Sequence, residues 1–373
     1  MMQSPKHILK LSCLAALVLI AACVSPPEFR IEPLPAYESM FENQEGWTGA
    51  DGVYSVALAD QLILWLFGDT WVGAVRNNVH VNAVIVNNSI ALQRGLPPSD
   101  STVDFYFGRA PEGRPAALIQ PADGRGWLWI YHGVHTSRGL YLFLVQVERT
   151  PEPPAASFKL IGTWLAHVGN PRDPPQNWRI DHYRIPWASF SSAGDTLFGS
   201  WVLRQAEWAY IYGTTEDVVD GFHHKYMILA RAPVGGLTEF GRWQFFADGK
   251  WLSDFTEADR LCDGVANEFS VSFLPALGKY IVVYSDSHRS DGLLARLAPD
   301  PWGPWGDPMT IYRCPEAGRN PTVICYAAKG HPEISQGPDE LIVTYVANST
   351  DFDTMVNDAG LYRPQFIRVR VGD

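Results

Sequence analysis

Short apolar runs separated by polar turns follow one another along most of this chain, and few stretches sustain helical periodicity. Apolar runs of one kind recur five times and begin roughly 60–80 residues apart. They are Leu62–Phe67, Trp127–Tyr131, Leu197–Val202, Lys279–Tyr284 and Leu341–Tyr345. Each run is apolar on both faces, which is typical of an inner strand sandwiched between neighbouring sheets. The pattern therefore predicts an all-β protein built from five similar units.

Most of the five units show a second strand pattern close to the recurring run. These second patterns are Tyr141–Val147, Trp208–Tyr212, Tyr226–Ala230, Leu293–Leu297 and Phe366–Val371. A propeller blade is a four-stranded sheet, and blades lengthen when their loops carry function. We therefore expect a single five-bladed β-propeller over residues 41–373. Two β-sandwich domains are the alternative, but no linker of suitable composition divides the chain near its middle.

Two carboxylates flank one predicted hairpin. Its strands are Val53–Leu58 and Leu62–Phe67, joined by the polar turn Ala59–Gln61. Asp51 precedes the first strand and Asp69 follows the second, so pairing of the strands brings both acids to one end of the hairpin. Glycoside hydrolysis requires a pair of carboxyl groups close together, and two acids at a strand edge can supply it. The alternative is that both are turn carboxylates that accept hydrogen bonds from backbone N–H groups.

Further polar residues lie before or at predicted inner strands, where a propeller brings distant segments to the mouth of its central channel. The candidates for substrate binding are Asp181, Glu268, His331 and Glu333, with Trp71 as a possible sugar platform. A carboxylate in such a channel is partly desolvated and lies near other acids, so its pKa should rise toward the range of a general acid. Structural roles are the alternatives: an ion pair of Glu333 with Arg319 or Lys329, and core positions for His331 and Trp71.

Composition and charge narrow the class of ligand. The chain has 14 tryptophans and 13% aromatic residues, which suits a protein that stacks rings against sugars. Packing between sheets is the alternative use of these rings. The formal net charge of −11 repels phosphate backbones, so nucleic acid is not an expected partner, whereas neutral polysaccharide is compatible. The chain contains no GxSxG elbow, phosphate loop or GxGxxG motif, so an α/β-hydrolase triad and a nucleotide site have no support.

The first 22 residues have the pattern of a signal peptide. Lys6 and Lys10 precede the apolar run Leu11–Ala22, which is too short to span a bilayer. The letters LIAAC, which end at Cys23, resemble the lipobox of bacterial lipoproteins and imply acylation of Cys23. Secretory cleavage without lipidation is the alternative. The proline-rich residues 23–40 predict an extended tether, so we expect an exported lipoprotein at the outer membrane or cell surface.

Besides Cys23, the expected mature chain contains three cysteines, Cys262, Cys314 and Cys325. No CxxC pair occurs, so neither a zinc site nor a redox site is predicted. Cys314 and Cys325 flank a loop that contains proline and glycine, and the sequence leaves open whether they form a disulfide. No cofactor is expected. A structural calcium ion near His331 is conceivable, but nothing in the spacing requires one.

Several segments together resemble a known family. They read TGADGVYSV with LWLFGDTWVG, ANEFSVSFLP, YAAKGHPEIS with ELIVTYVANS, and LYRPQFIRVRV. This set resembles a bacterial family catalogued as domain-of-unknown-function family 4185, over nearly the whole expected mature chain. The resemblance implies a five-bladed propeller of the endo-D-arabinanase type, which cuts arabinofuranose chains of mycobacterial-type cell-wall glycans. The essential acids of that family match Asp51 and Asp69, while the middle segment Gly108–Thr256 departs most from it.

We therefore expect a monomeric glycoside hydrolase that acts on a furanose-containing polysaccharide, with D-arabinan as the named substrate. One of Asp51 and Asp69 protonates the leaving oxygen, and the other activates water or attacks the anomeric carbon. The separation of the two carboxyl groups decides between inversion and retention, and the resemblance favours inversion. A non-catalytic surface lipoprotein that captures glycans is the alternative function.

Overall fold

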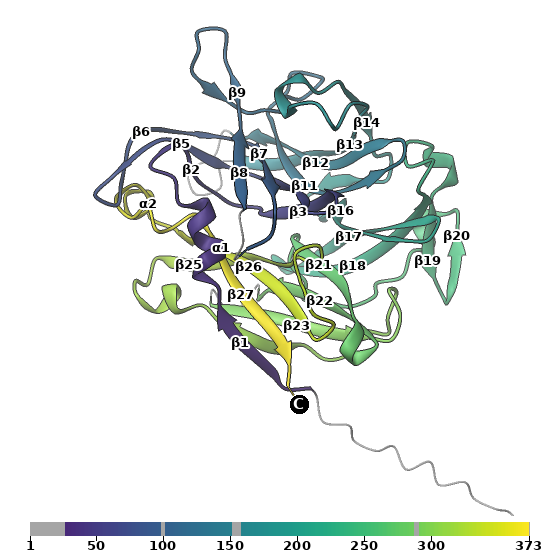
Figure 1. Ribbon diagram of the computed structural model, residues 1–373. Helices are drawn as coiled ribbons and strands as arrows, with labels where there is room; N and C mark the ends of the chain where they lie inside the picture. The colour runs from purple at the N-terminus through teal and green to yellow at the C-terminus, as the bar shows by residue number, and fades with distance from the viewer. Residues whose placement is uncertain (1–26, 98–100, 151–157, 287–290, 373) are drawn as a thin grey trace, which may run out of the picture.

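Strands make up most of the molecule (Figure 1), whose computed structural model describes residues 27–97, 101–150, 158–286 and 291–372. The helices are the short α1 (Pro35–Glu38) and α2 (Phe352–Asn357) and the 3-10 turns Ser39–Phe41, Pro175–Asn177, Phe240–Arg242, Phe255–Glu257, Pro275–Leu277 and Pro315–Gly318. The prediction of a nearly all-β fold is confirmed. The signal peptide and Cys23 lie outside the described residues. Within those residues, no helix has the length and apolar character needed to cross a membrane.

Antiparallel sheets of four or more strands follow one another along the chain, and we number them 1 to 5. Sheet 1 contains β3 (Tyr54–Ala59), β4 (Leu62–Phe67), β7 (Ser89–Arg94) and β8 (Thr102–Tyr106). Sheet 2 contains β11 (Trp127–Thr136), β12 (Gly139–Arg149), β13 (Phe158–Val168) and β14 (Ile180–Arg184). Sheet 3 contains β15 (Ser189–Ser191), β16 (Gly194–Gln205), β17 (Trp208–Val219), β18 (Phe222–Pro233), β19 (Gln244–Ala247) and β20 (Lys250–Leu252).

The last two sheets complete this series. Sheet 4 contains β21 (Phe269–Leu274), β22 (Lys279–Ser285), β23 (Gly292–Ala298) and β24 (Met309–Arg313). Sheet 5 contains β25 (Val323–Gly330), β26 (Glu340–Ser349), β27 (Pro364–Val371) and, at its outer edge, β1 (Phe29–Pro33). A small separate pair is formed by β9 (Gly108–Arg109) and β10 (Pro115–Ala116).

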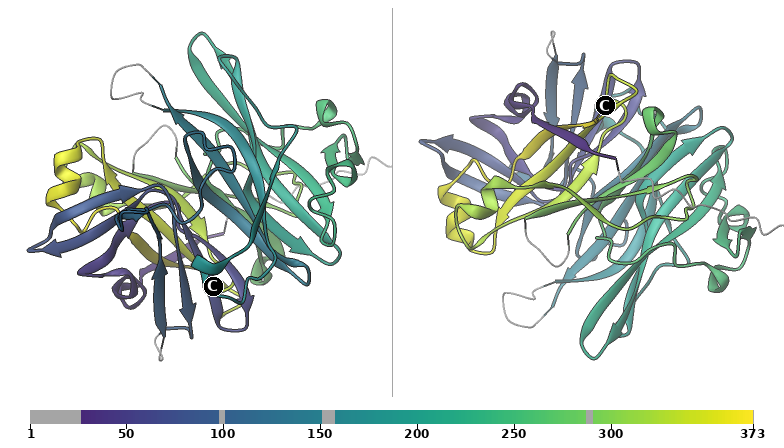
Figure 2. Two further views of the ribbon diagram at one scale, coloured as in Figure 1. Left: turned by 90° about the horizontal axis from the view of Figure 1, so that it is seen from above. Right: turned by 90° about the horizontal axis from the view of Figure 1, so that it is seen from below.

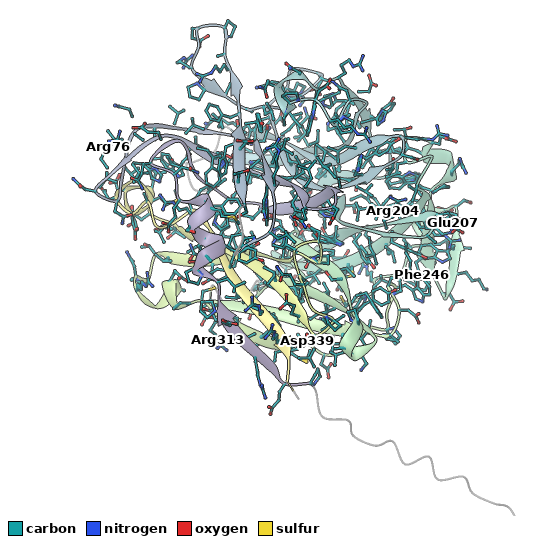
Figure 3. The ribbon with its side chains drawn as sticks, viewed as in Figure 1. Arg76, Arg204, Glu207, Phe246, Arg313 and Asp339 are labelled. Atoms are coloured by element: carbon teal, nitrogen blue, oxygen red, sulfur yellow. The ribbon has the colours of Figure 1, made fainter. Side chains whose placement is uncertain are left out.

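A three-stranded side sheet interrupts sheet 1. It consists of β2 (Glu45–Ala50), β5 (Thr70–Arg76) and β6 (Val79–Val86). Figure 3 shows Arg76 at the outer tip of its β5–β6 hairpin. The chain runs from β2 into β3, and from β4 into β5, so two antiparallel strands pass together from the side sheet into sheet 1. This crossing is where both predicted catalytic aspartates lie.

Inner strands of successive sheets contact one another: β3 with β11, β11 with β16, β16 with β21, and β21 with β25. Polar side chains on or beside these strands join the sheets. These hydrogen bonds are His132 Nε2 to the Ser55 carbonyl (3.0 Å), Thr214 Oγ1 to Asn267 Oδ1 (3.0 Å), the Gly330 amide to Ser270 Oγ (2.6 Å), and His331 Nδ1 with Ser55 Oγ (2.5 Å). Sheet 5 is thereby joined to sheet 1 as well as to sheet 4.

The recurring apolar runs do not all occupy the innermost position that the sequence pattern predicts for them. The runs that begin at Leu62, Lys279 and Leu341 form the second strands β4, β22 and β26 of their sheets. The first strands β3 and β21 carry buried serines instead, Ser55 and Ser270 among them. The side chains on the two faces of β4 belong to different core clusters, Leu64 and Leu66 to one and Trp65 and Phe67 to another, so this second strand is packed on both faces. The most apolar strand is therefore the second one.

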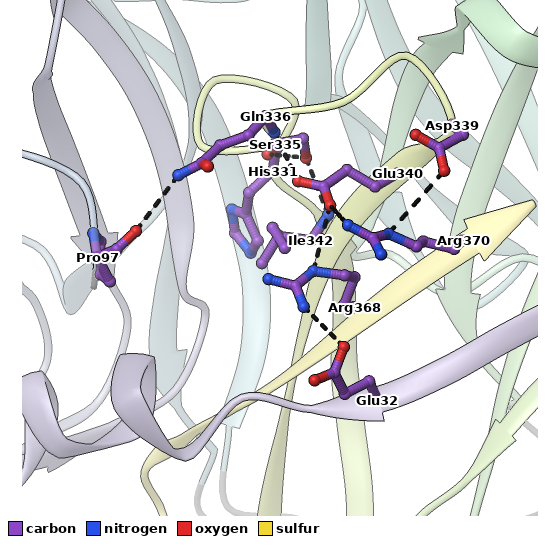
Figure 4. A network of polar contacts seen from close by, with 10 residues as sticks. All are labelled: Glu32, Pro97, His331, Ser335, Gln336, Asp339, Glu340, Ile342, Arg368 and Arg370. Carbon is purple, nitrogen blue, oxygen red and sulfur yellow. Dashed lines mark hydrogen bonds and ion pairs between the residues drawn. The ribbon is translucent and has the colours of Figure 1, made fainter. Parts of the chain in front are cut away.

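The segment predicted as an extended tether belongs to the fold from Phe29 onward. Strand β1 pairs with β27, and the alternating residues Phe29 and Ile31 pack against the core between sheets 4 and 5. Arg368 on β27 bridges Glu32 at 2.7 Å and the buried Glu340 at 3.2 Å (Figure 4). The first described strand and the last one therefore lie side by side (Figure 1).

Three clusters of buried side chains form the core. The largest lies among sheets 1 to 4, the second between sheet 1, the side sheet and sheet 5, and the third between sheets 4 and 5. Trp47, Trp65 and Trp243 are among the largest fully buried side chains. Much of the aromatic content is therefore used in packing between sheets, which was the structural alternative to sugar stacking.

Candidate active site

The two aspartates of the predicted hairpin lie next to each other. Strands β3 and β4 pair with Tyr54 opposite Leu66, as the sequence predicts. Beyond this pairing, the amide of Asp51 donates to the carbonyl of Asp69 at 3.2 Å, and the amide of Gly68 donates to the carbonyl of Asp51 at 3.1 Å. Most of the surface of each aspartate is buried, and a smaller part is exposed. The hairpin therefore presents two carboxyl groups at the break between the side sheet and sheet 1.

Backbone strain and a missing side chain shape this break. Val53 has φ of +53°, which is rare for a β-branched residue because of steric crowding. Gly68 leaves room for Asp51, because a Cβ at this position would come within 2.5 Å of Asp51 Oδ1. Strained backbone tends to collect at functional sites. The bends at Asp51 and Gly68 therefore form a specific arrangement around one carboxyl group, beyond the turn carboxylates that the sequence offered as the alternative.

Two tyrosine hydroxyls hold the carboxyl group of Asp51. Tyr326 and Tyr362 both donate to Asp51 Oδ2, at 2.6 and 2.8 Å. Burial raises the pKa of Asp51 to about 8, helped by the nearby charges of Asp69 and Glu268 and opposed by the two hydroxyls. Asp51 is therefore a carboxyl group that keeps its proton near neutral pH.

Asp69 has a different environment. Its Oδ1 accepts hydrogen bonds from Trp129 Nε1 at 3.0 Å and from Asn87 Nδ2 at 3.1 Å. Burial raises the pKa of Asp69, and these two N–H donors oppose the rise because they stabilise the ionised form. Because the two aspartates interact, they titrate as a pair, and the donors favour the negative charge on Asp69.

A third carboxylate, Glu268, precedes β21 and lines the same cavity. Lys329 Nζ donates to Glu268 Oε1 at 3.0 Å and to the Ala327 carbonyl at 2.8 Å, and it lies 4.3 Å from the centre of the Tyr54 ring. The Lys329 side chain is 0% exposed, while that of Glu268 is 20% exposed. Burial lowers the pKa of Lys329, and the charges of Glu268 and Asp51 oppose this. The buried ammonium group is thus held by partners that favour its charge.

A β-bulge in β25 aims two side chains at the site. Pairing of β25 with β26 slips between Tyr326 and Lys329, and Ala327 has φ of +59°. Residues three apart on a regular strand point to opposite faces. The bulge turns both side chains inward, Tyr326 to Asp51 and Lys329 to Glu268.

A cavity of about 1280 Å³ opens over the aspartates. Its lining includes Asp51, Asp69, Trp129, Phe158, Phe190, Glu216, Lys225, Asn267, Glu268, Tyr326, Asn348 and Tyr362. It extends to the long hairpin of β17 and β18, which projects from the body in teal-green (Figure 2). Phe158 is 50% exposed and meets the edge of Trp129 with ring centres 5.1 Å apart. These two rings form an aromatic surface beside Asp69.

The other residues predicted to bind substrate do not join this group. Trp71 is 3% exposed and stacks on His80 in the side sheet, and Asp181 is exposed on β14, the outermost strand of sheet 2. His331 is fully buried beyond the end of β25, followed by Glu333, whose pKa burial raises to about 7. The described lining of the cavity includes none of these four residues. The prediction placed Asp181, His331 and Glu333 before or at inner strands. Of the residues predicted to bind substrate, Glu268 is the one in the described lining of the cavity.

The described residues contain no group of three or more histidines, cysteines and acids arranged to hold a metal ion. Both ring nitrogens of His331 have partners, Ser55 at 2.5 Å and Thr344 at 2.7 Å. Cys262, Cys314 and Cys325 are free thiols, and the last two are buried in the core between sheets 4 and 5. A hydrogen bond with Cys325 is the main cause that raises the pKa of the Cys314 thiol.

Sequence reasoning missed the contacts of four residues with the aspartates, Asn87, Trp129, Tyr326 and Tyr362. It also missed the pairing of Lys329 with Glu268, having named Glu333 as a possible partner of Lys329. One of them had a readable signal, because Lys329 is a charged residue inside an otherwise apolar strand pattern. A lysine in that position must find a partner when it is buried. The tyrosines carry no comparable signal.

Solved structures resemble this chain at low sequence identity. A candidate hydrolase from Bacteroides ovatus ATCC 8483 is 19% identical, with a TM-score of 0.71 over 91% of this chain and 90% of that chain. A thermostable family-43 glycoside hydrolase is 13% identical, with a TM-score of 0.45 over 88% of this chain and 91% of that chain. An α-L-arabinofuranosidase from Podospora anserina is 10% identical, with a TM-score of 0.44 over 88% and 93%. The first likeness shows a shared fold, and the other two scores are too low to carry an argument.

Comparison with curated proteins finds no match to this sequence. The profile of a family described as a domain of unknown function (DUF5005) matches residues 35–371. The resemblance to family 4185 is not confirmed, because the matching family is a different one. The match covers every strand of the five sheets except β1, which ends at Pro33, together with the residues that line the cavity. The chain therefore belongs to the DUF5005 family.

Proposed function

We propose that this protein is a glycoside hydrolase that cleaves a furanose-containing polysaccharide within its chain, with D-arabinan as the substrate. The observation that carries the proposal is the pair Asp51 and Asp69, which lie side by side under an open cavity in unlike environments. When the surroundings of two carboxyl groups give them different pKa values, the group that keeps its proton is assigned as the acid and the ionised group as the base or nucleophile. The Bacteroides ovatus protein with the TM-score of 0.71 is described as a candidate hydrolase, and this description agrees with the proposed hydrolase activity.

The environments assign the two roles. Asp51, with a pKa of about 8, holds the proton that passes to the glycosidic oxygen as the bond to the anomeric carbon breaks. Asp69, whose charge is stabilised by Trp129 and Asn87, takes a proton from the attacking water or attacks the anomeric carbon itself. Configuration inverts in the first case and is retained in the second. We propose inversion, and NMR of the first-formed product tests it.

The cavity supports an oligomeric substrate. Its volume of about 1280 Å³ exceeds the roughly 300–1,000 Å³ of ordinary small-molecule pockets, so it has room for several sugar units. Trp129 and Phe158 offer apolar ring surfaces beside Asp69, against which sugar faces stack. Glu268 adds an acceptor for sugar hydroxyl groups. These features favour cleavage within a chain.

We further propose that sheets 1 to 5 are the blades of a five-bladed propeller. Their order along the chain, the contacts between successive inner strands, and the hydrogen bonds of Ser55 with both His132 and His331 support this arrangement. The placement of β1 beside β27 joins the two ends of the described chain in one blade. Such a propeller brings residues from several sheets to one end of a central channel, where the cavity lies.

The proposal is tested by incubating the purified protein with D-arabinan, L-arabinan, arabinogalactan, fructan and galactan and measuring released reducing ends. We expect oligosaccharides from D-arabinan. Binding of a glycan in a pull-down assay with no release of reducing ends over long incubation would support the alternative, a non-catalytic glycan-binding lipoprotein. Release of reducing ends from a different furanose polymer would support the glycoside hydrolase activity and identify that polymer as the substrate in place of D-arabinan.

A further inference from the structure

Two hydroxyl groups converge on one oxygen atom of Asp51. Tyr326 and Tyr362 donate to Oδ2, and neither donates to Oδ1. Asn348 Nδ2 donates to the Tyr326 hydroxyl at 3.3 Å, which occupies a lone pair of that oxygen and leaves its proton for Asp51. Oδ2 therefore accepts two hydrogen bonds at 2.6 and 2.8 Å. An oxygen in this position has little room for a proton of its own.

The backbone around both tyrosines is unusual in a way that produces this convergence. The bulge in β25 adjoins Tyr326, and Tyr362 itself has φ of +59°. Gly49 leaves space for this conformation, because a Cβ there would come within 2.6 Å of the Tyr362 carbonyl oxygen. Residues in this region of φ persist only where the surrounding structure holds them. The tyrosines reach Asp51 through local conformations that ordinary strand packing does not need.

We propose that Tyr326 and Tyr362 are positioning residues that occupy Oδ2 of Asp51 and thereby confine its acidic proton to Oδ1. Oδ1 lies against Gly68, in space that a Cβ at this position would take, and Gly68 and the adjacent Trp129 both line the cavity, as Asp51 does. The inference rests on the proposed function, because the proton on Oδ1 is the one that a glycosidic oxygen in the cavity would receive. It deepens that function by naming which oxygen of the carboxyl group acts as the donor.

Other groups also act on the proton of Asp51. Those that face it are Asp69 after β4, Glu268 before β21, Lys329 on β25, Tyr54 on β3 and Tyr131 on β11. The two tyrosine hydroxyls stabilise the ionised carboxylate and so lower its pKa, whereas burial and the two acids raise it. Removal of the hydroxyls therefore raises the pKa of Asp51 and frees the proton to occupy either oxygen.

The test uses Tyr326→Phe, Tyr362→Phe and the double variant, each of which keeps the buried ring and removes the donor. Tyr212→Phe is the matched control, because Tyr212 is fully buried and its hydroxyl donates to the Pro301 carbonyl at 2.7 Å, outside the cavity lining. The side-chain carboxyl of Asp51 is titrated by carbon-13 NMR without substrate, with Asp51→Asn to assign its signal. The activity of each variant is then measured against pH.

We expect the pKa of Asp51 to rise by about one unit for each hydroxyl removed, and the alkaline limb of the activity profile to move upward with it. The turnover number kcat should fall about tenfold in the double variant while KM stays within about twofold, because an acid whose pKa is about two units higher gives up its proton less readily. Tyr212→Phe should change neither quantity. If the double variant does not fold, the single variants provide the test, because each should show half of the pKa shift expected for the double variant.

An unchanged or lowered pKa of Asp51 in the tyrosine variants would overturn the inference. So would the same shift in the Tyr212 control. The NMR titration needs no substrate, so it separates this inference from the proposed function. If the unaltered protein hydrolyses no glycan, the proposed function fails. The titration still decides whether the hydroxyl groups of Tyr326 and Tyr362 control the protonation of Asp51.

Discussion

The backbone amide of Asp51 donates a hydrogen bond of 3.2 Å to the carbonyl of Asp69. This contact fixes the two acids at the crossing between the side sheet and sheet 1, with their side chains under the same cavity. Their surroundings differ in chemistry: hydroxyl groups and other acids around Asp51, and nitrogen donors around Asp69. That asymmetry is the basis for assigning an acid and a base.

The first prediction concerns pH and stability. The pKa of Asp51 is about 8 in the folded protein, above its ordinary value of 3.8, so the fold favours the protonated form. This contribution to stability is fully present below about pH 4 and is lost as pH rises through about 8. Asp51→Asn mimics the protonated form and removes this dependence. We expect the unfolding free energy of the variant to exceed that of the original protein by an amount that grows from pH 5 to about pH 8 and then levels off, measured by urea denaturation.

A variant at an exposed acid provides the control for this measurement. Asp104→Asn removes a carboxylate whose side chain is 54% exposed in its ion pair with Arg94. Its unfolding free energy should follow that of the original protein across the same pH range, because exposed ion pairs contribute little. A parallel pH dependence of Asp51→Asn and the original protein would contradict the account of Asp51.

The second prediction concerns the buried pair of Lys329 and Glu268. Lys329→Met removes the cation and leaves the Glu268 carboxylate without its partner at 3.0 Å. Loss of one member of a buried ion pair costs about 3–5 kcal/mol of stability. The double variant Lys329→Met with Glu268→Gln should recover part of this loss, because it removes the unpaired charge. Chemical denaturation of the two single variants, Lys329→Met and Glu268→Gln, and of the double variant measures the coupling. Strictly additive losses would count against a direct interaction.

The third prediction concerns the donor from Trp129 to Asp69. Trp129→Phe keeps an aromatic ring against Phe158 but removes the N–H that lies 3.0 Å from Asp69 Oδ1. Because this donor lowers the pKa of Asp69, the acid limb of the activity profile should move to higher pH, with a loss of about tenfold in kcat. Trp127→Phe is the matched control, since the buried Trp127 Nε1 has no hydrogen-bond partner among the described residues. An acid limb that moves equally in both variants would exclude a specific role for Trp129.

The hairpin was predictable from sequence because its strand patterns, its turn and both acids lie within one short segment. The tyrosines were not, since Tyr326 and Tyr362 reach Asp51 from the far end of the chain through a bulge and a positive φ that no periodicity indicates. Trp71 and Asp181, which the sequence offered as substrate-binding residues, do not line the cavity. Trp71 belongs to a side sheet that the strand pattern did not reveal, and Asp181 to an outermost strand.

The fourth prediction concerns the N-terminal segment, for which we propose export and lipidation at Cys23. Cys23→Ala should move the protein from the membrane fraction to the soluble fraction of cells that express it, because the acyl chains are the expected anchor. Metabolic labelling with a radioactive fatty acid should mark the original protein and not the variant. Labelling of both proteins would show that Cys23 is not the attachment site of the fatty acid.

The most direct test of the catalytic pair is hydrolysis by Asp51→Asn and Asp69→Asn, measured as reducing ends released from D-arabinan. Both variants keep the shape of the side chains, and both should fold as the original protein does. We predict that each loses activity by about 10²–10⁴-fold, the range that positioned acid–base groups contribute. Folded variants that retain the hydrolysis rate of the original protein would contradict the assignment of Asp51 and Asp69.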